Sequence, residues 1–238
     1  MKIKSLLAQA QRYKKSIGTK NESSLHKKLK FQYTGLGGKN EVEVGEYVAD
    51  GVRKDGEFIE VQTGSFAPLK KKVKEFAAAG KVRIIHPIAV SKIIEVYNTE
   101  GKLLHKRRSS ARGSLWDIFN ALLYAPELPL IKGVIIEAVL VDITEKRVND
   151  GNGSWRRKGI SIKDKELLSF RESVIFSKPK DFLRFFPFKK GDEFTVASLA
   201  EKANIKSWLA GRTLYVLTKL KVIKRIGKKR NAFVYVRK

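Results

Sequence analysis

The chain has 238 residues, enough for one large domain or for two to three small ones with a hydrophobic core. It carries 50 Lys and Arg against 24 Asp and Glu, a formal net charge of +26, and it contains no cysteine. The missing cysteines exclude disulfides, thiolate chemistry and Cys-ligated zinc sites. The charge opposes compaction unless a polyanion is bound, and nucleic acid is the commonest such partner; a merely Lys-rich soluble protein is the alternative.

The first 18 residues, MKIKSLLAQAQRYKKSIG, are basic and amphipathic. Their apolar residues recur at helical spacing, which predicts a first helix. The segment lacks the apolar core and the cleavage site of a signal peptide, and no apolar run in the chain is long enough to cross a membrane. We therefore expect a cytoplasmic protein without a membrane partner.

Residues 19–97 show helical and strand-like patterns in the order helix, three strands, helix and two strands. The expected helices cover residues 21–33 and 68–81, and the expected strands cover residues 40–44, 46–53, 57–64, 82–90 and 92–97. The fourth strand, VRIIHPIAV, is continuously apolar, as in strands that are buried on both faces of a mixed sheet. This order predicts an α/β layer within a first domain of residues 1–102.

A middle α+β segment, residues 103–178, follows. The sequence predicts a helix over residues 114–129 that stops near Pro126. It also predicts a long hairpin, with strands over residues 133–148 and 159–170 around the basic tip NDGNGSWRRK. No function is assigned to this segment.

The last segment, residues 179–238, has the order short helix, helix, longer helix and hairpin. This order resembles a winged helix-turn-helix, in which the longer helix enters the major groove of DNA. The resemblance implies DNA contacts at Lys206, Ser207, Arg212, Tyr215, Lys228, Lys229 and Arg230. The core face of the longer helix is expected at Leu209, Val216, Leu217 and Leu220. A winged helix that binds protein or packs on its own chain is the alternative.

The stretch DGVRKDGEFIEVQTG, residues 50–64, is a hairpin with two open registers. A two-residue loop would pair Asp50 with Val61 and place Glu60 on the opposite face. A three-residue loop, with Gly56 in the left-handed region, would place Asp50 opposite Glu60 and on the same face as Gln62. Both loops are chemically acceptable. We favour the second, because it gives the Asp50 carboxylate polar neighbours instead of valines.

The same stretch resembles the PD-(D/E)XK nuclease pattern: an Asp in one strand and Glu-x-Lys in the next, after an acid-bearing helix and before a helix and a strand. The resemblance implies a restriction-endonuclease-like mixed sheet flanked by helices. It also implies that Asp50, Glu60 and the backbone carbonyl of Val61 bind Mg²⁺ or Mn²⁺, and Glu22 matches the extra acid of some members. The segments NESSLHKKLK, IEVQTGSF and VRIIHPIAV are also similar to a poorly characterised prokaryotic family.

One residue departs from this pattern, because Gln62 stands where the motif has Lys. Gln can position a water molecule but offers no charge. A lysine displaced onto the next helix could supply that charge, and the candidates there are Lys70, Lys71, Lys72 and Lys74. Lys70, Lys71 and Lys74 are otherwise expected to contact nucleic-acid phosphates or to form a solvated basic face. The three histidines, His26, His86 and His105, lack metal-ligand spacing, and we expect a structural role for His86, which ends an apolar strand just before Pro87.

These observations favour a metal-dependent DNA endonuclease whose C-terminal winged helix holds double-stranded DNA. Asp50 and Glu60 would bind the metal, Gln62 would position water and Glu22 would assist. A non-catalytic DNA-binding or regulatory protein with a degenerate nuclease-like core is the first alternative, consistent with Gln62. An RNA-binding or RNA-processing protein is the second, because charge does not separate DNA from RNA. The oligomeric state stays open, with a homodimer as one candidate.

Overall fold

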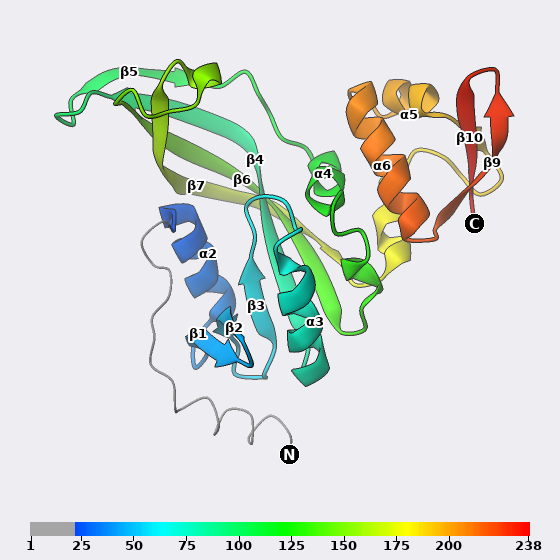
Figure 1. Ribbon diagram of the computed structural model, residues 1–238, viewed down its shortest axis with the longest axis horizontal. Helices are drawn as coiled ribbons and strands as arrows, with labels where there is room; N and C mark the ends of the chain where they lie inside the picture. Colours follow the sequence, from blue (N-terminus) through cyan, green and yellow to red (C-terminus); the bar gives the residue numbers. More distant parts are fainter. Residues whose placement is uncertain (1–21) are drawn as a thin grey trace.

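The computed structural model describes residues 22–238, and the helix predicted over residues 1–18 lies outside this part. The protein has a mixed α+β architecture with a large mixed sheet flanked by helices (Figure 1), which confirms the fold class at that level. In the described residues no helix is long and apolar enough to cross a membrane.

The seven-stranded sheet has the order β1-β2-β3-β4-β6-β7, with β5 paired to β4. Its strands β3 and β4, and β4 and β6, are parallel, and its other neighbours are antiparallel. The strands are β1 Lys39–Val44, β2 Tyr47–Val52, β3 Phe58–Val61, β4 Val82–Tyr97, β5 Leu103–Arg108, β6 Val134–Asn149 and β7 Ile160–Phe176. Since β4 and β6 pair side by side, the predicted segments 1–102 and 103–178 share one sheet.

Helices α2 (Ser24–Thr34) and α3 (Leu69–Ala79) cover opposite faces of this sheet. Strand β3 explains why. Side chains alternate between the two faces of a strand, so Phe58 packs with the α3 residue Phe76, whereas Ile59 packs with the α2 side chains. Helix α2 begins after Ser23, whose side chain accepts a hydrogen bond from the backbone N–H of His26.

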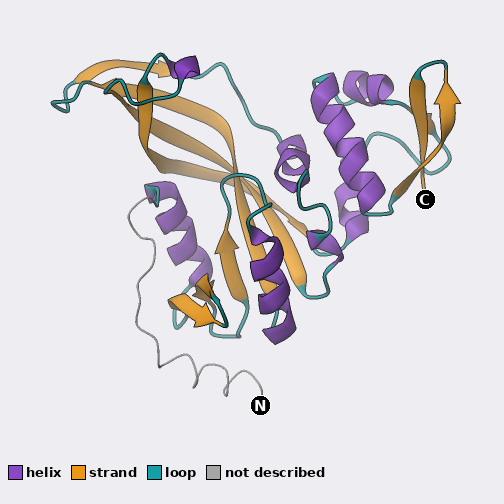
Figure 2. Cartoon of the chain, in the orientation of Figure 1, coloured by secondary structure: helices purple, strands orange, loops and turns teal. Residues whose placement is uncertain are grey.

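Strand β4 is a single strand of 16 residues where the sequence predicts two. Strands β4, β6 and β7 continue well past α2 and form a twisted arm with β5 (Figures 1 and 2). The helix predicted over residues 114–129 is instead broken into η3 (Leu115–Asp117), α4 (Ile118–Leu122) and η4 (Leu128–Leu130). Proline lacks the backbone N–H that a helix needs, so Pro126 accounts for the break between α4 and η4.

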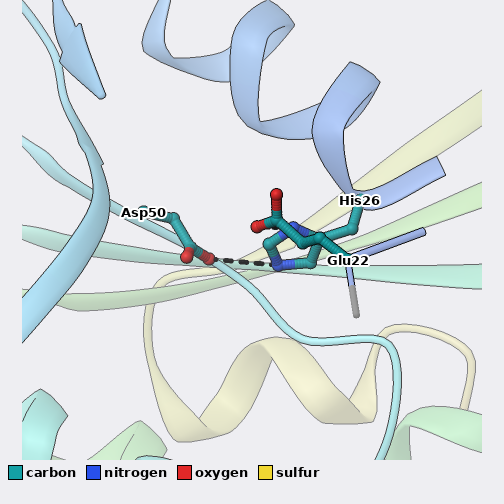
Figure 3. A group of neighbouring side chains, drawn as sticks. All are labelled: Glu22, His26 and Asp50. Atoms are coloured by element: carbon teal, nitrogen blue, oxygen red, sulfur yellow. Dashed lines mark ion pairs between the residues drawn. The ribbon is translucent and has the colours of Figure 1, made fainter. Parts of the chain in front are cut away.

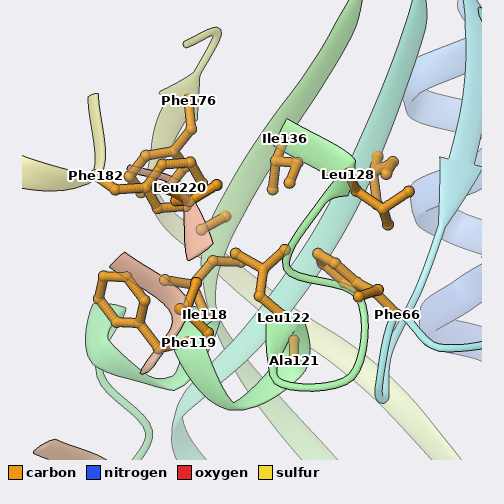
Figure 4. Close-up of a cluster of buried hydrophobic side chains, with 14 of the residues drawn as sticks. Phe66, Ile118, Phe119, Ala121, Leu122, Leu128, Ile136, Phe176, Phe182 and Leu220 are labelled. Atoms are coloured by element: carbon orange, nitrogen blue, oxygen red, sulfur yellow. The ribbon is translucent and has the colours of Figure 1, made fainter. Parts of the chain in front are cut away.

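The C-terminal module, residues 179–238, has a second sheet with the order β8-β10-β9 beside two helices. Its elements are η6 Pro179–Leu183, β8 Glu193–Phe194, α5 Val196–Lys202, α6 Ser207–Lys219, β9 Ile223–Lys229 and β10 Ala232–Arg237. A continuous buried cluster joins the module to the α3 face of the large sheet (Figure 4). In it Phe176 of β7 stacks on Phe182 of η6 with ring centroids 4.2 Å apart.

Candidate metal centre

The hairpin between β2 and β3 adopts the register with a three-residue loop. Val52 pairs with Phe58, and the Arg53 backbone N–H donates to the Glu57 carbonyl at 2.9 Å. Gly56 has φ of 85°, the left-handed conformation that this loop requires of a glycine. The prediction of this register is therefore confirmed, and its continuation sets Asp50 opposite Glu60.

Hydrogen bonds from backbone N–H groups to the two carboxylates also hold Asp50 and Glu60 together. The Asp50 backbone N–H donates to Glu60 Oε1 at 3.1 Å, and the Val61 backbone N–H donates to Asp50 Oδ2 at 2.8 Å. Glu60 is only 2% exposed. Two carboxylates are thus held close together in a largely buried place, where their mutual repulsion is weakly screened.

Helix α2 brings the imidazole of His26 to the Asp50 carboxylate (Figure 3). His26 Nε2 lies 2.9 Å from the Val61 carbonyl oxygen and 3.3 Å from Asp50 Oδ2. On the other side of the ring, His26 Nδ1 lies 2.7 Å from Glu22 Oε1. His26, which is not among the ligands predicted from the sequence, therefore lies at the centre of the cluster. The signal that could have found it is the Glu22–His26 spacing of four residues, which brings Glu22, just before the N-cap of α2, next to a side chain of the first turn.

The titration behaviour of the cluster reflects its crowded charges. Burial raises the pKa of Glu60, and the charge of Asp50 raises it further, to about 7 despite the nearby Lys72 ammonium. Burial also raises the pKa of Asp50, but the hydrogen bond and charge of His26 outweigh burial and lower it overall. Burial lowers the pKa of His26, whereas Asp50 and Glu22 raise it above its usual value overall. The carboxylates of the cluster therefore favour the approach of a positively charged group.

The donor atoms fit a divalent cation. One ligand atom each from Glu22, His26 and Asp50 lie within 4.8 Å of one another. Adjacent ligands of an octahedral Mg²⁺ with bonds of about 2.1 Å lie about 3 Å apart. The His26 Nε2 distances to the Val61 carbonyl and to Asp50 Oδ2, 2.9 and 3.3 Å, are of this size. In the described chain His26 Nδ1 is buried without an aligned hydrogen bond, although Glu22 Oε1 lies 2.7 Å away, so the carboxylate of Glu22 is the group beside this nitrogen.

Two lysines neutralise the acids of the cluster. Lys72 of α3 places its Nζ 2.7 Å from Glu60 Oε2. Lys30 of α2 donates to both carboxylate oxygens of Glu22, at 3.0 and 3.1 Å. The Gln62 side chain instead donates to the Ser65 carbonyl at 2.7 Å. Of the lysines that the sequence offers as displaced cations, the structure thus places Lys72 at the carboxylates.

The cluster opens into a cavity of about 470 Å³, which we call the metal cavity. Glu22 and His26 line one side of it, and Lys163 and Lys165 of β7 line the other. The Ser24 backbone N–H and hydroxyl both donate to the Asp164 carboxylate, at 2.8 and 2.6 Å. These bonds fix the start of α2 against β7, so Glu22 and His26 lie across the cavity from Lys163 and Lys165.

The other predicted contact residues lie away from the cluster. Lys70 pairs with Glu127 at 2.8 Å, while Lys71 and Lys74 are exposed on α3. On the C-terminal module, Arg212 donates to the Asn120 side chain of α4 and lies over the Trp208 ring. The remaining residues, Lys206, Ser207, Tyr215, Lys228, Lys229 and Arg230, are exposed. The predicted core residues Leu209, Val216, Leu217 and Leu220 are buried, which confirms that prediction.

Residues 23–177, from the cap of α2 to the end of β7, match the family described as "Domain of unknown function (DUF8091)". The chain belongs to the DUF8091 family. Its DUF8091 domain contains His26, Asp50 and Glu60, and Glu22 lies one residue before the match.

A relative in Treponema pallidum (strain Nichols), described as "Uncharacterized protein", is 29% identical over 161 residues. This similarity covers 68% of the present chain and 64% of the relative, so the chain spans less than two thirds of that protein's length. No solved structure matches the chain.

Proposed function

We propose that the DUF8091 domain of this chain is a divalent-metal-dependent nuclease that hydrolyses phosphodiester bonds in DNA. The observation that carries the proposal is the convergence of Asp50, the Val61 carbonyl and His26 Nε2 beside Glu60 and Lys72. The hairpin register, the helices on both faces of a mixed sheet and the position of α3 also suit a restriction-endonuclease-like core.

The residues of the cluster have separate tasks in this proposal. Asp50 Oδ2, the Val61 carbonyl and His26 Nε2 hold a Mg²⁺ or Mn²⁺ ion, and Glu60 completes the set once it is deprotonated. Glu22 orients the His26 ring from the Nδ1 side, as carboxylates commonly do beside metal-binding histidines. When bound, such an ion polarises the phosphate and lowers the pKa of a water molecule.

Lys72 takes the place of the lysine that the motif has at Gln62. Its ammonium is already held at the carboxylates by Glu60, in a place where it is 19% exposed. From there it stabilises negative charge that builds up on the scissile phosphate. Lys165, across the metal cavity, attracts a neighbouring phosphate, whereas the Lys163 ammonium on the same wall pairs with Asp150 at 2.9 Å.

The C-terminal module supplies the contact with DNA in this proposal, as a winged helix. Support comes from its element order and from the strand order β8-β10-β9, in which the short strand pairs with the last one. The tip of its hairpin carries Lys228, Lys229 and Arg230, all exposed, and such a basic tip suits phosphate contacts.

Incubation of the full chain with supercoiled plasmid tests the proposal. We expect nicking or linearisation with Mg²⁺ or Mn²⁺, none with EDTA, and none from the Asp50→Asn and His26→Ala variants. The Asp142→Asn variant removes a carboxylate that pairs with Arg171 on the arm, and it should cut normally. Tight, salt-sensitive binding without cutting would instead indicate a DNA-binding protein with a degenerate core. Cutting of RNA alone would refute the DNA assignment.

A further inference from the structure

Three cavities form a row between the metal centre and helix α6. The metal cavity shares Thr63 with a second cavity of about 450 Å³, the loop cavity, beside residues 63–65. The loop cavity in turn shares Tyr124 with a third, the tyrosine cavity, of about 370 Å³. Tyr215 and Lys219 of α6 line the far side of the tyrosine cavity. The loop cavity, at the end of β3, thus adjoins both the metal cavity and the tyrosine cavity beside α6.

Exposed aromatic rings lie at the α6 end of this row. Tyr124 is 65% exposed and Tyr215 is 45% exposed, on opposite sides of the tyrosine cavity. Trp208, which is 50% exposed, precedes Tyr215 by seven residues and therefore lies on the same face of α6. Packing in the core does not explain large rings that remain in solvent, and such clusters mark binding surfaces.

Each of the two α6 rings has a cation against it. Lys219 Nζ lies 5.6 Å from the centre of the Tyr215 ring, and the Arg212 guanidinium lies 4.8 Å from that of Trp208. Lys70 adds a further positive charge at the tyrosine cavity. Aromatic rings beside cations are how proteins hold single-stranded nucleic acid, because bases stack on the rings while the cations neutralise phosphates.

The surroundings of α6 favour a single strand over a duplex. Arg212 is tied to Asn120, so α4 lies alongside the exposed face of α6 (Figure 1). Tyr124 and Leu130, from the segment after α4, form the opposite wall of the tyrosine cavity. A major groove that received this face would also have to receive α4, whereas an unpaired strand fits between the two walls.

We propose that the tyrosine cavity and the Trp208–Tyr215 face of α6 bind an unpaired strand of the nucleic-acid substrate and direct it along the row of cavities to the metal centre. The inference rests on the proposed nuclease function and specifies its substrate class: DNA with a single-stranded segment, such as a flap, gap or overhang. Bases stack on Tyr124 and Tyr215, so recognition tolerates any sequence.

Binding of a fluorescent oligothymidylate in EDTA, followed by anisotropy, tests this surface without any cleavage. We expect the wild type to bind the single strand more tightly than a blunt duplex of equal length. The Tyr124→Ala and Tyr215→Ala variants should each bind it about tenfold more weakly, since each loses one stacked base. Tyr215→Phe keeps the ring and should bind normally. So should Phe31→Ala, which removes a ring that is 73% exposed on α2.

A second measurement uses the unaltered chain, so it does not depend on whether a variant folds. Photocrosslinking with an oligonucleotide that contains 5-iodouracil should label Tyr124, Tyr215 or Trp208. Tighter duplex binding, unchanged affinity in both alanine variants, or crosslinks confined to the β9–β10 hairpin would each overturn the inference. Binding that needs the tyrosines but comes without cleavage would refute only the nuclease, and cleavage without tyrosine-dependent binding would refute only this surface.

Discussion

Lys72 Nζ of α3 lies 2.7 Å from Glu60 Oε2 of β3, although the two residues are twelve positions apart. The sequence has Gln62 where the nuclease motif has lysine, and the Gln62 side chain donates to the Ser65 carbonyl. The cation of the site therefore comes from the helix that follows the hairpin. Lys72 also lies over the Phe76 ring, 5.7 Å from its centre, which keeps the ammonium on the inner side of α3.

Replacement of Lys72 by Met should remove catalysis and leave metal binding intact. Loss of one stabilising donor for transition-state charge typically lowers kcat by about 10²–10³-fold. Plasmid cleavage under single-turnover conditions measures the effect. Lys71→Met, a change at the exposed neighbouring position, serves as the matched control and should cut at the wild-type rate. If the Lys72→Met protein cuts DNA and the Gln62→Ala protein does not, Gln62 rather than Lys72 is the residue that stabilises the transition state.

The metal-free protein should lose stability as the pH rises from 5 to 8. The pKa of Glu60 is raised from its usual 4.5 to about 7 in the folded chain, so folding favours its protonated form. The stabilisation is complete below the unfolded pKa and disappears as the pH passes through about 7. A shift of this size corresponds to a change in the free energy of unfolding on the order of 3 kcal/mol.

The Glu60→Gln variant isolates that contribution, because Gln cannot ionise. Urea unfolding in EDTA at pH 5 and pH 8 should show a smaller loss of stability in the variant than in the wild type. Glu95→Gln, at a carboxylate that pairs with Lys106 on the arm, should leave the wild-type pH dependence unchanged. Equal pH dependence in wild type and Glu60→Gln would show that Glu60 is not the titrating group.

Mn²⁺ should stabilise the wild-type chain against heat. A ligand present at 100 times its Kd adds about 2.7 kcal/mol, which for a chain of this size raises Tm by about 5–10 °C. The shift should be absent in Asp50→Asn and in His26→Ala and fully present in Asp142→Asn. Thermal unfolding by circular dichroism with increasing Mn²⁺ measures it. Equal shifts in all four proteins would place the binding elsewhere.

The C-terminal module should unfold together with the large sheet. Phe182 is fully buried and stacks on Phe176 of β7, within the cluster that joins the two parts. Phe182→Ala should therefore lower the free energy of unfolding by about 3–5 kcal/mol within a single transition. Denaturant unfolding followed by both fluorescence and circular dichroism checks this. Two separate transitions in the wild type would mean that the module is an independent folding unit.

Local patterns were sufficient to predict much of this structure. Helical spacing predicted α3 and α6, and the need of the Asp50 carboxylate for polar neighbours favoured the correct hairpin register where the loop chemistry left two open. Contacts between residues that meet only through tertiary packing were harder to predict. The Glu22–His26 spacing pairs these two side chains, but nothing in the sequence near His26 indicates that α2 crosses β3 at Val61, so the sequence does not predict His26 as a ligand.

Two further features could be recognised only from the folded structure. Lys72 could not be separated from Lys70, Lys71 and Lys74, because the rotation of α3 over the sheet decides which lysine faces Glu60. The sequence predicts two strands where the structure has the single strand β4. The second half of β4 pairs with β5 and β6 in the arm rather than with β3. The partners of a long strand depend on segments far away in the sequence.

The most direct measurement of the metal centre is an anomalous difference map from crystals of the full chain grown with Mn²⁺. The account predicts one peak about 2.1–2.3 Å from His26 Nε2, Asp50 Oδ2 and the Val61 carbonyl oxygen, with Glu60 turned toward it. A map at saturating Mn²⁺ with no peak at these atoms, and with the His26 and Asp50 side chains still in contact with each other, would contradict it.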